Sequence, residues 1–411
     1  MASLKELREL NRLRLLEALR QGGAADRAEL VRQTGLSRAT VSALVSECMS
    51  RGVIVEDGER TGAARGGRRS ARLRLDPSAG TVLGVDFGHR HVRVALADLA
   101  STVLAERRVD LDVDASPATA LDTASELAST VLAEARIDRK RVLGAGMGLP
   151  GPIDHRTGTV VGSSSILAQW TGLQPADELS RRLELPVRLD NDANLGALGE
   201  FVHGAGRYAT DIVYVKISAG VGAGLVLDGC LQTGASGIAG ELGHVVVVPG
   251  GALCRCGNRG CLETVASSTA LLRRLEPAHG AGLTTQHLLE LAESGNREVT
   301  SALTAAGAFV GRALAALTTA LNPEVIVVGG DLGAASEVLL DAIRTELRRA
   351  ALPGAGRLPV RAAILADRAE ALGAIALALS EPDWLRRSGL IALNGAAAGA
   401  SQMPAAKRST A

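Results

Sequence analysis

The chain has 411 residues, enough for two or three domains that each bury a core of their own. Only 2% of its residues are aromatic, which argues against a protein that binds RNA or single-stranded DNA by stacking bases on aromatic rings. The net charge of +1 conceals an uneven distribution: residues 1–76 contain 15 Lys and Arg against 10 Asp and Glu, so the basic excess is confined to the N-terminal end.

The first predicted element is an amphipathic helix that stops at Gly22 and Gly23. Its apolar face is expected to consist of Leu10, Leu13, Leu16 and Leu19. A helix-turn-helix pattern follows, in which Asp26 caps one helix, residues 34–36 form the turn and Ser37 caps a second helix. The second helix exposes short or basic side chains that can approach base edges in a major groove. They are Ser37, Arg38, Ala39, Thr40, Ser42 and Ser46.

Two short predicted strands, at 53–55 and 73–75, flank a segment rich in Arg and Gly. Six arginines and no acidic residue lie between Arg60 and Arg74, a concentration that favours phosphate contact over an ordinary solvated surface. A helix-turn-helix with an Arg-rich hairpin predicts a winged DNA-binding domain, although two packed helices of another kind could share such a turn. The residues expected to contact phosphate or the minor groove are Arg68, Arg69 and Arg72.

The DNA-binding domain is expected to span residues 1–76, with a linker at 77–80 and a larger α/β domain at 81–380. That domain opens with predicted strands at 82–87, 91–98 and 107–113, a helix at about 117–136 and a strand ending at 150. A second set repeats the order, with strands at 212–217, 221–227 and 245–248, a helix at 301–321 and a strand at 325–328. The repetition predicts a duplicated architecture with a cleft between two lobes. Residues 381–411 are expected to be a disordered tail.

One short segment, residues 240–263, contains four side chains that bind soft metal ions. They are His244, Cys254, Cys256 and Cys261. A set of three cysteines and one histidine forms a closed tetrahedral zinc site, so we predict a structural zinc ion rather than an open catalytic metal. The alternative is three reduced thiols that share a turn by chance. Cys48 and Cys230 lie far apart, which indicates a reducing cytoplasm rather than a disulfide framework.

Two further motifs leave alternatives open. The segment 190–194 follows a predicted strand and precedes a helix, so its carboxylates could take a proton from a hydroxyl or bind a polyol. Asn191 or Asp192 could equally cap the helix. The glycine-rich segment 218–224 could bring backbone N–H groups to a phosphate, or could simply form a tight hairpin.

Taken together, these motifs resemble the ROK family of repressors and sugar kinases, in its transcriptional-regulator branch with an N-terminal winged helix-turn-helix. The resemblance covers about residues 10–380 and is most specific where the glycines of 217–240 lead into GELGH and CRCGNRGCLE. It implies an α/β fold: the duplicated actin-like (ribonuclease H-like) sugar-kinase fold, with a sugar bound between its lobes. The implied sugar contacts are Asn191, Asp192, Glu241, His244 and Glu263.

The resemblance also implies roles for individual residues among the sugar contacts and the zinc ligands. Asp192 matches the general base of the family's kinases, and His244 serves the zinc ion with one ring nitrogen and the sugar with the other. The sequence departs from those kinases at Asp86-Phe87-Gly88-His89-Arg90, where the kinases carry Asp-x-Gly-Gly-Thr. Bulky side chains therefore occupy the approach to the ATP phosphates. The loop 163–170 also lacks the Asn that usually precedes its Trp.

We therefore expect a cytoplasmic, sugar-responsive transcriptional regulator, a repressor of genes for carbohydrate uptake or catabolism, without enzymatic activity. It would bind double-stranded operator DNA as a homodimer or homotetramer. No association with a membrane is expected. One alternative is an ATP-dependent, glucokinase-like sugar kinase with Asp192 as the catalytic base. A second is a DNA-bound architectural protein with a vestigial sugar lobe.

Overall fold

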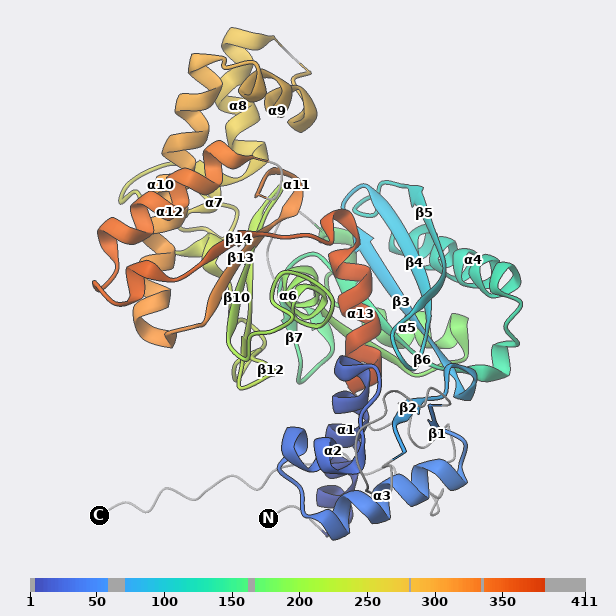
Figure 1. The fold of residues 1–411 in the computed structure, drawn as a ribbon. Helices are drawn as coiled ribbons and strands as arrows, with labels where there is room; N and C mark the ends of the chain where they lie inside the picture. Colours follow the sequence, from blue (N-terminus) through green and yellow to red (C-terminus); the bar gives the residue numbers. More distant parts are fainter. Residues whose placement is uncertain (1–3, 58–70, 162–166, 281, 334–335, 381–411) are drawn as a thin grey trace, which may run out of the picture.

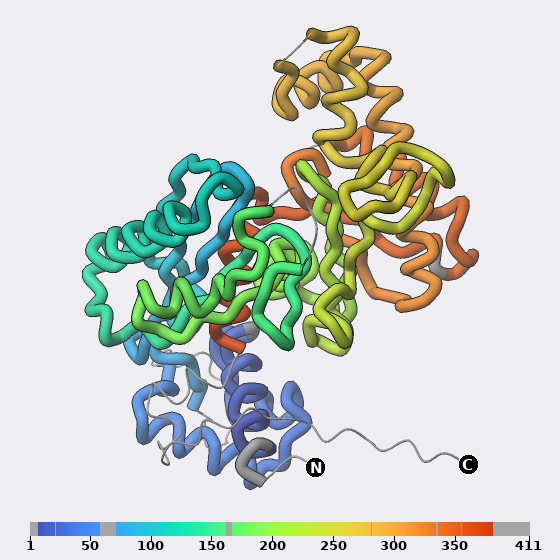
Figure 2. Tube along the Cα trace, turned by 180° about the vertical axis from the view of Figure 1, so that it is seen from behind, coloured from blue at the N-terminus to red at the C-terminus, as the bar shows by residue number. Residues whose placement is uncertain are grey.

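The computed structural model describes residues 4–57, 71–161, 167–280, 282–333 and 336–380. A small helical unit at the N-terminus lies beneath two larger lobes, each built on a five-stranded sheet (Figure 1). The view from behind shows the same three parts, with one end of helix α13 (Ala369–Ser380) directly above the N-terminal unit (Figure 2).

The N-terminal unit contains three helices and a short hairpin. They are α1 (Leu4–Gly22), α2 (Arg27–Thr34), α3 (Arg38–Ser50), β1 (Ile54–Glu56) and β2 (Leu73–Leu75). The predicted caps are confirmed, because the side chain of Asp26 accepts a hydrogen bond from Glu29 N and that of Ser37 accepts one from Thr40 N. Gly35 ends α2 with a φ of 67°, a conformation that a side chain would strain. Of the predicted apolar face of α1, Leu16 and Leu19 are buried, whereas Leu10 is exposed.

The first lobe has the strand order β5-β4-β3-β6-β9. Its strands are β3 (Thr81–Gly88), β4 (His91–Asp98), β5 (Val103–Asp110), β6 (Val142–Leu149) and β9 (Val187–Asn191). Strands β3, β6 and β9 are parallel, and β4 and β5 extend the sheet as an antiparallel meander. Helix α4 (Pro117–Ala135) contacts β4 and β5, while α13 contacts β3 and β6. Almost every residue of β3 is therefore buried, as expected of a strand covered on both faces. The lobe also contains β7 (Ile153–Asp154), β8 (Thr159–Val160) and α5 (Pro175–Leu183).

The second lobe repeats this arrangement with the order β12-β11-β10-β13-β14. Its strands are β10 (Ile212–Ile217), β11 (Val221–Leu227), β12 (Cys230–Leu231), β13 (Val325–Gly329) and β14 (Val360–Ala362). Its helices are α7 (Glu263–Ala266), α8 (Ser268–His279), α9 (Thr285–Glu293), α10 (Arg297–Leu321), α11 (Gly330–Gly333) and α12 (Glu337–Ala350). In both sheets two antiparallel pairings are followed by two parallel pairings, which confirms the predicted duplication. Helix α10 has the length and apolar composition of a membrane span, but it belongs to the buried core of this lobe.

Helices α6 (Asp192–Val202) and α13 lie side by side between the sheets. Small residues allow this close contact: a Cβ on Gly373 would lie 1.8 Å from the carbonyl oxygen of Leu195, and a Cβ on Gly146 would lie 1.9 Å from that of Ala374. Helix α13 therefore packs with its backbone directly against both α6 and β6.

A single buried apolar cluster joins the N-terminal unit to the first lobe. From the N-terminal unit it includes Leu15, Leu16, Leu19, Leu30, Val41, Leu44, Leu73 and Leu75. From the first lobe it includes Val82, Ala95, Ala97 and Leu143, together with Ala371, Leu372, Ile375, Ala378 and Leu379 of α13. The predicted linker is equally ordered: residues 77–79 form a 3-10 turn capped by Asp76. The N-terminal unit is thus held to the first lobe by a shared apolar core as well as by the connecting chain.

Two predicted strands differ from the structure. The third strand of the first lobe runs from Val103 to Asp110 rather than from 107 to 113. Residues 245–248 form no strand; Val246 makes only an isolated bridge to Cys261, while Val247 N and Val248 N both donate to the carbonyl oxygen of Gly260. The four-valine segment 245–248 therefore forms hydrogen bonds with the loop that carries the cysteines and does not extend the sheet.

Candidate functional site

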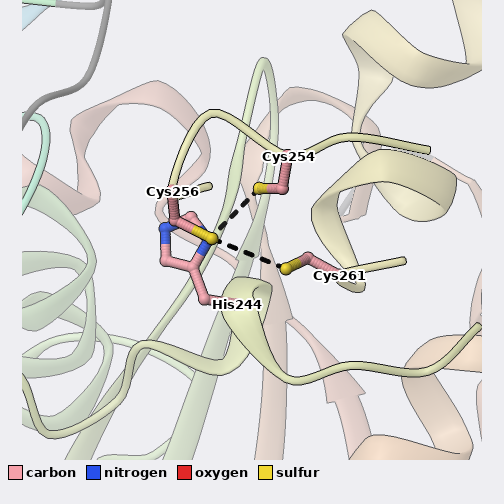
Figure 3. A group of neighbouring side chains, drawn as sticks. All are labelled: His244, Cys254, Cys256 and Cys261. Atoms are coloured by element: carbon pink, nitrogen blue, oxygen red, sulfur yellow. Dashed lines mark hydrogen bonds between the residues drawn. The ribbon is translucent and has the colours of Figure 1, made fainter. Parts of the chain in front are cut away.

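The four predicted metal ligands converge in the structure, with one donor atom of each lying within 4.8 Å of the other three. His244 ends the short 3-10 turn 242–244, and the cysteines come from the loop that precedes α7 (Figure 3). The Nδ1 atom of His244 lies 3.6 Å from Cys254 Sγ, and Cys256 Sγ lies 3.6 Å from Cys261 Sγ. The loop that holds them turns at Gly257 and Gly260, whose φ values of 91° and 74° are in the left-handed region.

These distances can be compared with a tetrahedral zinc site. Bonds of about 2.3 Å to sulfur and about 2.05 Å to nitrogen, at the tetrahedral angle, place S and N about 3.6 Å apart and two S atoms about 3.8 Å apart. Both observed separations, each 3.6 Å, are close to these values. The residues therefore fit a tetrahedral metal ion with no further protein ligand required.

The second nitrogen of His244 points toward the predicted sugar contacts. Its Nε2 atom lies 3.7 Å from Glu241 Oε2. Burial, and then the neighbouring carboxylate of Asp192, raise the pKa of Glu241 to about 7. His244 thus lies between the three cysteines and this carboxylate.

Glu263, the first residue of α7, is buried and engaged by neighbours. Arg255 lies between two of the cysteines, and its Nη2 atom is 2.6 Å from Glu263 Oε2. The same carboxylate oxygen accepts a hydrogen bond from Val221 N, and a Cβ on Gly220 would lie 2.7 Å from it. The glycine-rich segment 218–224 therefore forms the β10–β11 hairpin, and Gly220 leaves room for the Arg255–Glu263 pair. Sequence reasoning missed Arg255, although its place in Cys254-Arg255-Cys256 is a usable signal.

Asn191 and Asp192 stand where β9 ends and α6 begins. Asn191 is the N-cap of α6: its Oδ1 accepts from Ala193 N at 2.8 Å, and its Nδ2 donates to the carbonyl oxygen of Gly151 at 2.8 Å. Of the two residues that could cap the helix, Asn191 is therefore the one that does so. The carboxylate of Asp192 accepts from Ala193 N through Oδ1 and from a lysine through Oδ2.

That lysine, Lys216, was not identified from the sequence. Its Nζ lies 2.9 Å from Asp192 Oδ2 and 2.6 Å from Glu370 Oε1. Although burial alone would lower it, the carboxylates of Asp192, Glu370 and Asp86 hold the pKa of Lys216 well above its ordinary value. A lone lysine in the otherwise apolar strand 212–217 is a signal that could have found it.

The altered turn after β3 is also filled by side chains. His91 Nε2 lies 2.9 Å from Asp86 Oδ2, and its ring lies where a Cβ on Gly88 would be, 2.3 Å from Cε1. His89 Nδ1 lies 2.9 Å from Asp114 Oδ1. Each of these two histidines therefore has a carboxylate partner.

The predicted DNA-binding residues divide into three groups. Ser37, Arg38, Ala39, Ser42 and Ser46 are exposed along one side of α3, and Thr40 is half-buried with its hydroxyl 2.8 Å from that of Ser37. Arg72 is exposed, and its guanidinium donates to the carbonyl oxygen of Ala24. Arg68 and Arg69 lie outside the described residues.

Comparisons with known proteins agree with this architecture. The model of the ROK family matches residues 82–381, and a winged helix-turn-helix DNA-binding model matches residues 8–55. The xylose repressor of Caldicellulosiruptor bescii is 29% identical over 91% of this chain and 96% of its own length. The glucokinase of Thermotoga maritima is 34% identical over 72% of this chain and 96% of its own length.

Among solved structures, a ROK family transcriptional regulator described as a homologue of the Escherichia coli MLC protein aligns with a TM-score of 0.77 and 27% identity. It covers 93% of this chain and 99% of its own. The two regulators thus match over nine tenths of this chain, whereas the glucokinase matches 72% of it. The chain therefore belongs to the ROK family, in the transcriptional-regulator branch that carries an N-terminal winged helix-turn-helix.

Proposed function

We propose that this protein is a cytoplasmic, sugar-responsive transcriptional repressor that binds operator DNA through its winged helix-turn-helix and a sugar between its lobes. The observation that carries the proposal is the apolar cluster shared by α1, β2 and α13, because it couples the DNA-binding unit to the lobe that holds Asp192. A change in the cleft can therefore alter how the winged unit is presented to DNA.

The proposed sugar site consists of Asn191, Asp192, Glu241, His244 and Glu263. Carboxylates and an imidazole suit a polyol, because they accept hydrogen bonds from several hydroxyl groups at once. The xylose repressors among the relatives make D-xylose the first sugar to test.

A zinc ion held by His244, Cys254, Cys256 and Cys261 would have a structural role. Bound zinc would orient the imidazole toward Glu241 and hold the loop that carries Arg255 beside Glu263. Removal of zinc is therefore expected to weaken sugar binding.

On DNA, Ser37, Arg38, Ala39, Thr40 and Ser42 would lie in the major groove, and Arg68, Arg69 and Arg72 would contact phosphates or the minor groove. A homodimer or homotetramer would place two such units on a pseudo-palindromic operator. Light scattering of the protein with and without operator DNA measures the oligomeric state.

Sugar phosphorylation is the second candidate, favoured by the presence of Asp192 at the position of the kinase base. The surroundings disfavour it. Lys216 engages that carboxylate and His91 fills the turn that would face the phosphates, whereas phosphoryl transfer requires both a free base and positioned phosphates. ADP release with hexoses and pentoses, abolished by Asp192→Asn, would support the kinase.

The main test is a binding assay with DNA fragments selected from the genome by the full-length, zinc-loaded protein. D-xylose and a panel of other sugars should change the affinity for the selected fragment by about 5- to 150-fold, the usual range of allosteric coupling. Arg38→Ala should lose DNA binding and keep the thermal shift with sugar. Asp192→Asn should keep DNA binding and lose the thermal shift with sugar. Absence of sequence-specific DNA binding under all of these conditions would refute the proposal.

A further inference from the structure

The two helices that meet at Lys216 also reach the DNA-binding unit. Helix α6 begins at Asp192, and Glu370 is the second residue of α13. With 11 and 12 residues, the helices extend about 16–18 Å at 1.5 Å per residue. Lys216 thus contacts the N-terminal end of both helices, where a carboxylate is also favoured by the helix dipole.

The opposite ends of these helices lie at the winged unit. Figure 1 shows the lower end of α13 directly above α1, and the view in Figure 2 agrees. Ala378 and Leu379, in the last turn of α13, belong to the apolar cluster that contains Leu16 and Leu19 of α1. At the end of α6, burial lowers the pKa of the C-cap residue His203, and the nearby charge of Arg20 of α1 lowers it further.

Lys216 comes from the second lobe, and so do the strands β10 and β11 on which α6 mainly packs, whereas α13 packs on β3 and β6 of the first lobe. Lys216 lies in β10, the central strand of the second sheet, and its side chain is only 18% exposed. Its ion pair with Glu370 therefore joins the second lobe to the helix that packs on the first. Because the pairs are largely shielded from water, losing one partner leaves an uncompensated charge and is costly.

A sugar hydroxyl that donates to Asp192 has to share that carboxylate. Oδ1 already accepts from Ala193 N, and Oδ2 accepts from Lys216. A hydroxyl bound at Oδ2 would weaken the Lys216–Asp192 pair and leave the ammonium group with Glu370 as its main partner. The balance between the two pairs thus depends on whether the proposed sugar site is filled.

We propose that Lys216 is the positioning residue that transmits occupancy of the sugar site to the DNA-binding unit, through its alternating ion pairs with Asp192 of α6 and Glu370 of α13. The inference rests on the proposed function, since it describes how that site is regulated. Close packing of α13 on α6, with Gly373 against Leu195, makes the two helices respond together.

The first experiment needs neither sugar nor DNA. Hydrogen exchange is measured on the full-length, zinc-loaded protein and on the variants Glu370→Gln and Lys216→Met. Both substitutions should speed exchange of the amides of residues 8–22 and 369–380 by about threefold or more, as the link to the winged unit loosens. Lys216→Arg, which keeps the charge, should restore slow exchange.

The matched control is Glu346→Gln in α12. Glu346 is also a buried glutamate with cationic partners, Arg312 and Arg349, but it lies in the second lobe away from both helices. This variant should leave exchange of residues 8–22 unchanged. Equal exchange in Glu370→Gln and in the wild-type protein would overturn the inference.

The second experiment measures DNA affinity with and without D-xylose. Glu370→Gln should bind D-xylose more weakly than wild type, because a hydroxyl at Asp192 Oδ2 then leaves Lys216 without its partner Glu370, and at saturating D-xylose the change in DNA affinity should fall below about twofold. A full response in this variant would also overturn the inference. A wild-type protein whose DNA binding responds to no sugar contradicts the proposed function instead, and the exchange experiment then still decides the role of Lys216.

Discussion

Replacing His244 tests whether one side chain serves both the metal ion and the sugar. His244→Ala removes one of four converging donors, and its effect on zinc affinity should exceed the 10- to 100-fold loss that follows removal of an outer-shell partner. The same change removes a proposed sugar contact. One hydrogen bond contributes about 0.5–1.5 kcal/mol, so sugar affinity should fall by about 2- to 13-fold from this cause alone.

A second variant, His244→Cys, separates the two roles. The nitrogen that faces Cys254 is Nδ1, the ring nitrogen nearer the backbone, so a thiolate can reach nearly the same point. This variant should keep zinc in a site of four thiolates and lose only the sugar contact. Elemental analysis gives zinc per chain, and calorimetry with D-xylose gives the affinity.

The outcomes discriminate clearly between the possible roles. His244→Ala should lose zinc and sugar response together, whereas His244→Cys should keep zinc and bind sugar about 2- to 13-fold more weakly. Retention of both zinc and full sugar affinity by His244→Ala would refute the shared role. Full sugar affinity in His244→Cys would show that the imidazole acts only on the metal.

Three further substitutions test the packing. Gly373→Ala places a Cβ 1.8 Å from the Leu195 carbonyl oxygen and should destabilise the fold by about 1–3 kcal/mol, seen as a lower urea midpoint. Trp170→Phe leaves the Val113 carbonyl without its donor at 3.0 Å and should cost about 1–3 kcal/mol in the same assay; an unchanged midpoint would contradict this. Burial lowers the pKa of His203, so the contribution of this residue to stability should be constant above about pH 6.5 and become unfavourable as the pH drops below it; His203→Gln should reduce the loss of stability between about pH 6.5 and 5 in thermal unfolding.

Local features of the fold followed directly from neighbouring residues. Asp26 and Ser37 cap their helices as predicted, because a capping hydrogen bond depends only on a side chain and a backbone N–H two or three residues later. The same rule allowed either Asn191 or Asp192 to be the cap of the next helix, and only the structure shows that the cap is Asn191. Residues 245–248 have strong β propensity, yet their hydrogen bonds to Gly260 place them in a loop.

The sequence by itself determined the chemistry available to this protein: a helix-turn-helix, a donor set of three cysteines and one histidine, and a duplicated α/β pattern with an altered phosphate turn. Only the tertiary structure decided which of those groups interact. Lys216 and Glu370 are 154 positions apart, and no local periodicity relates them, yet their charged atoms lie 2.6 Å from each other. The cluster that joins Leu16 to Leu379 is equally remote in sequence. Such contacts arise because the DNA-binding unit and the first lobe bury apolar faces against α13, while the second lobe packs on α6, an arrangement that depends on the packing of the whole chain.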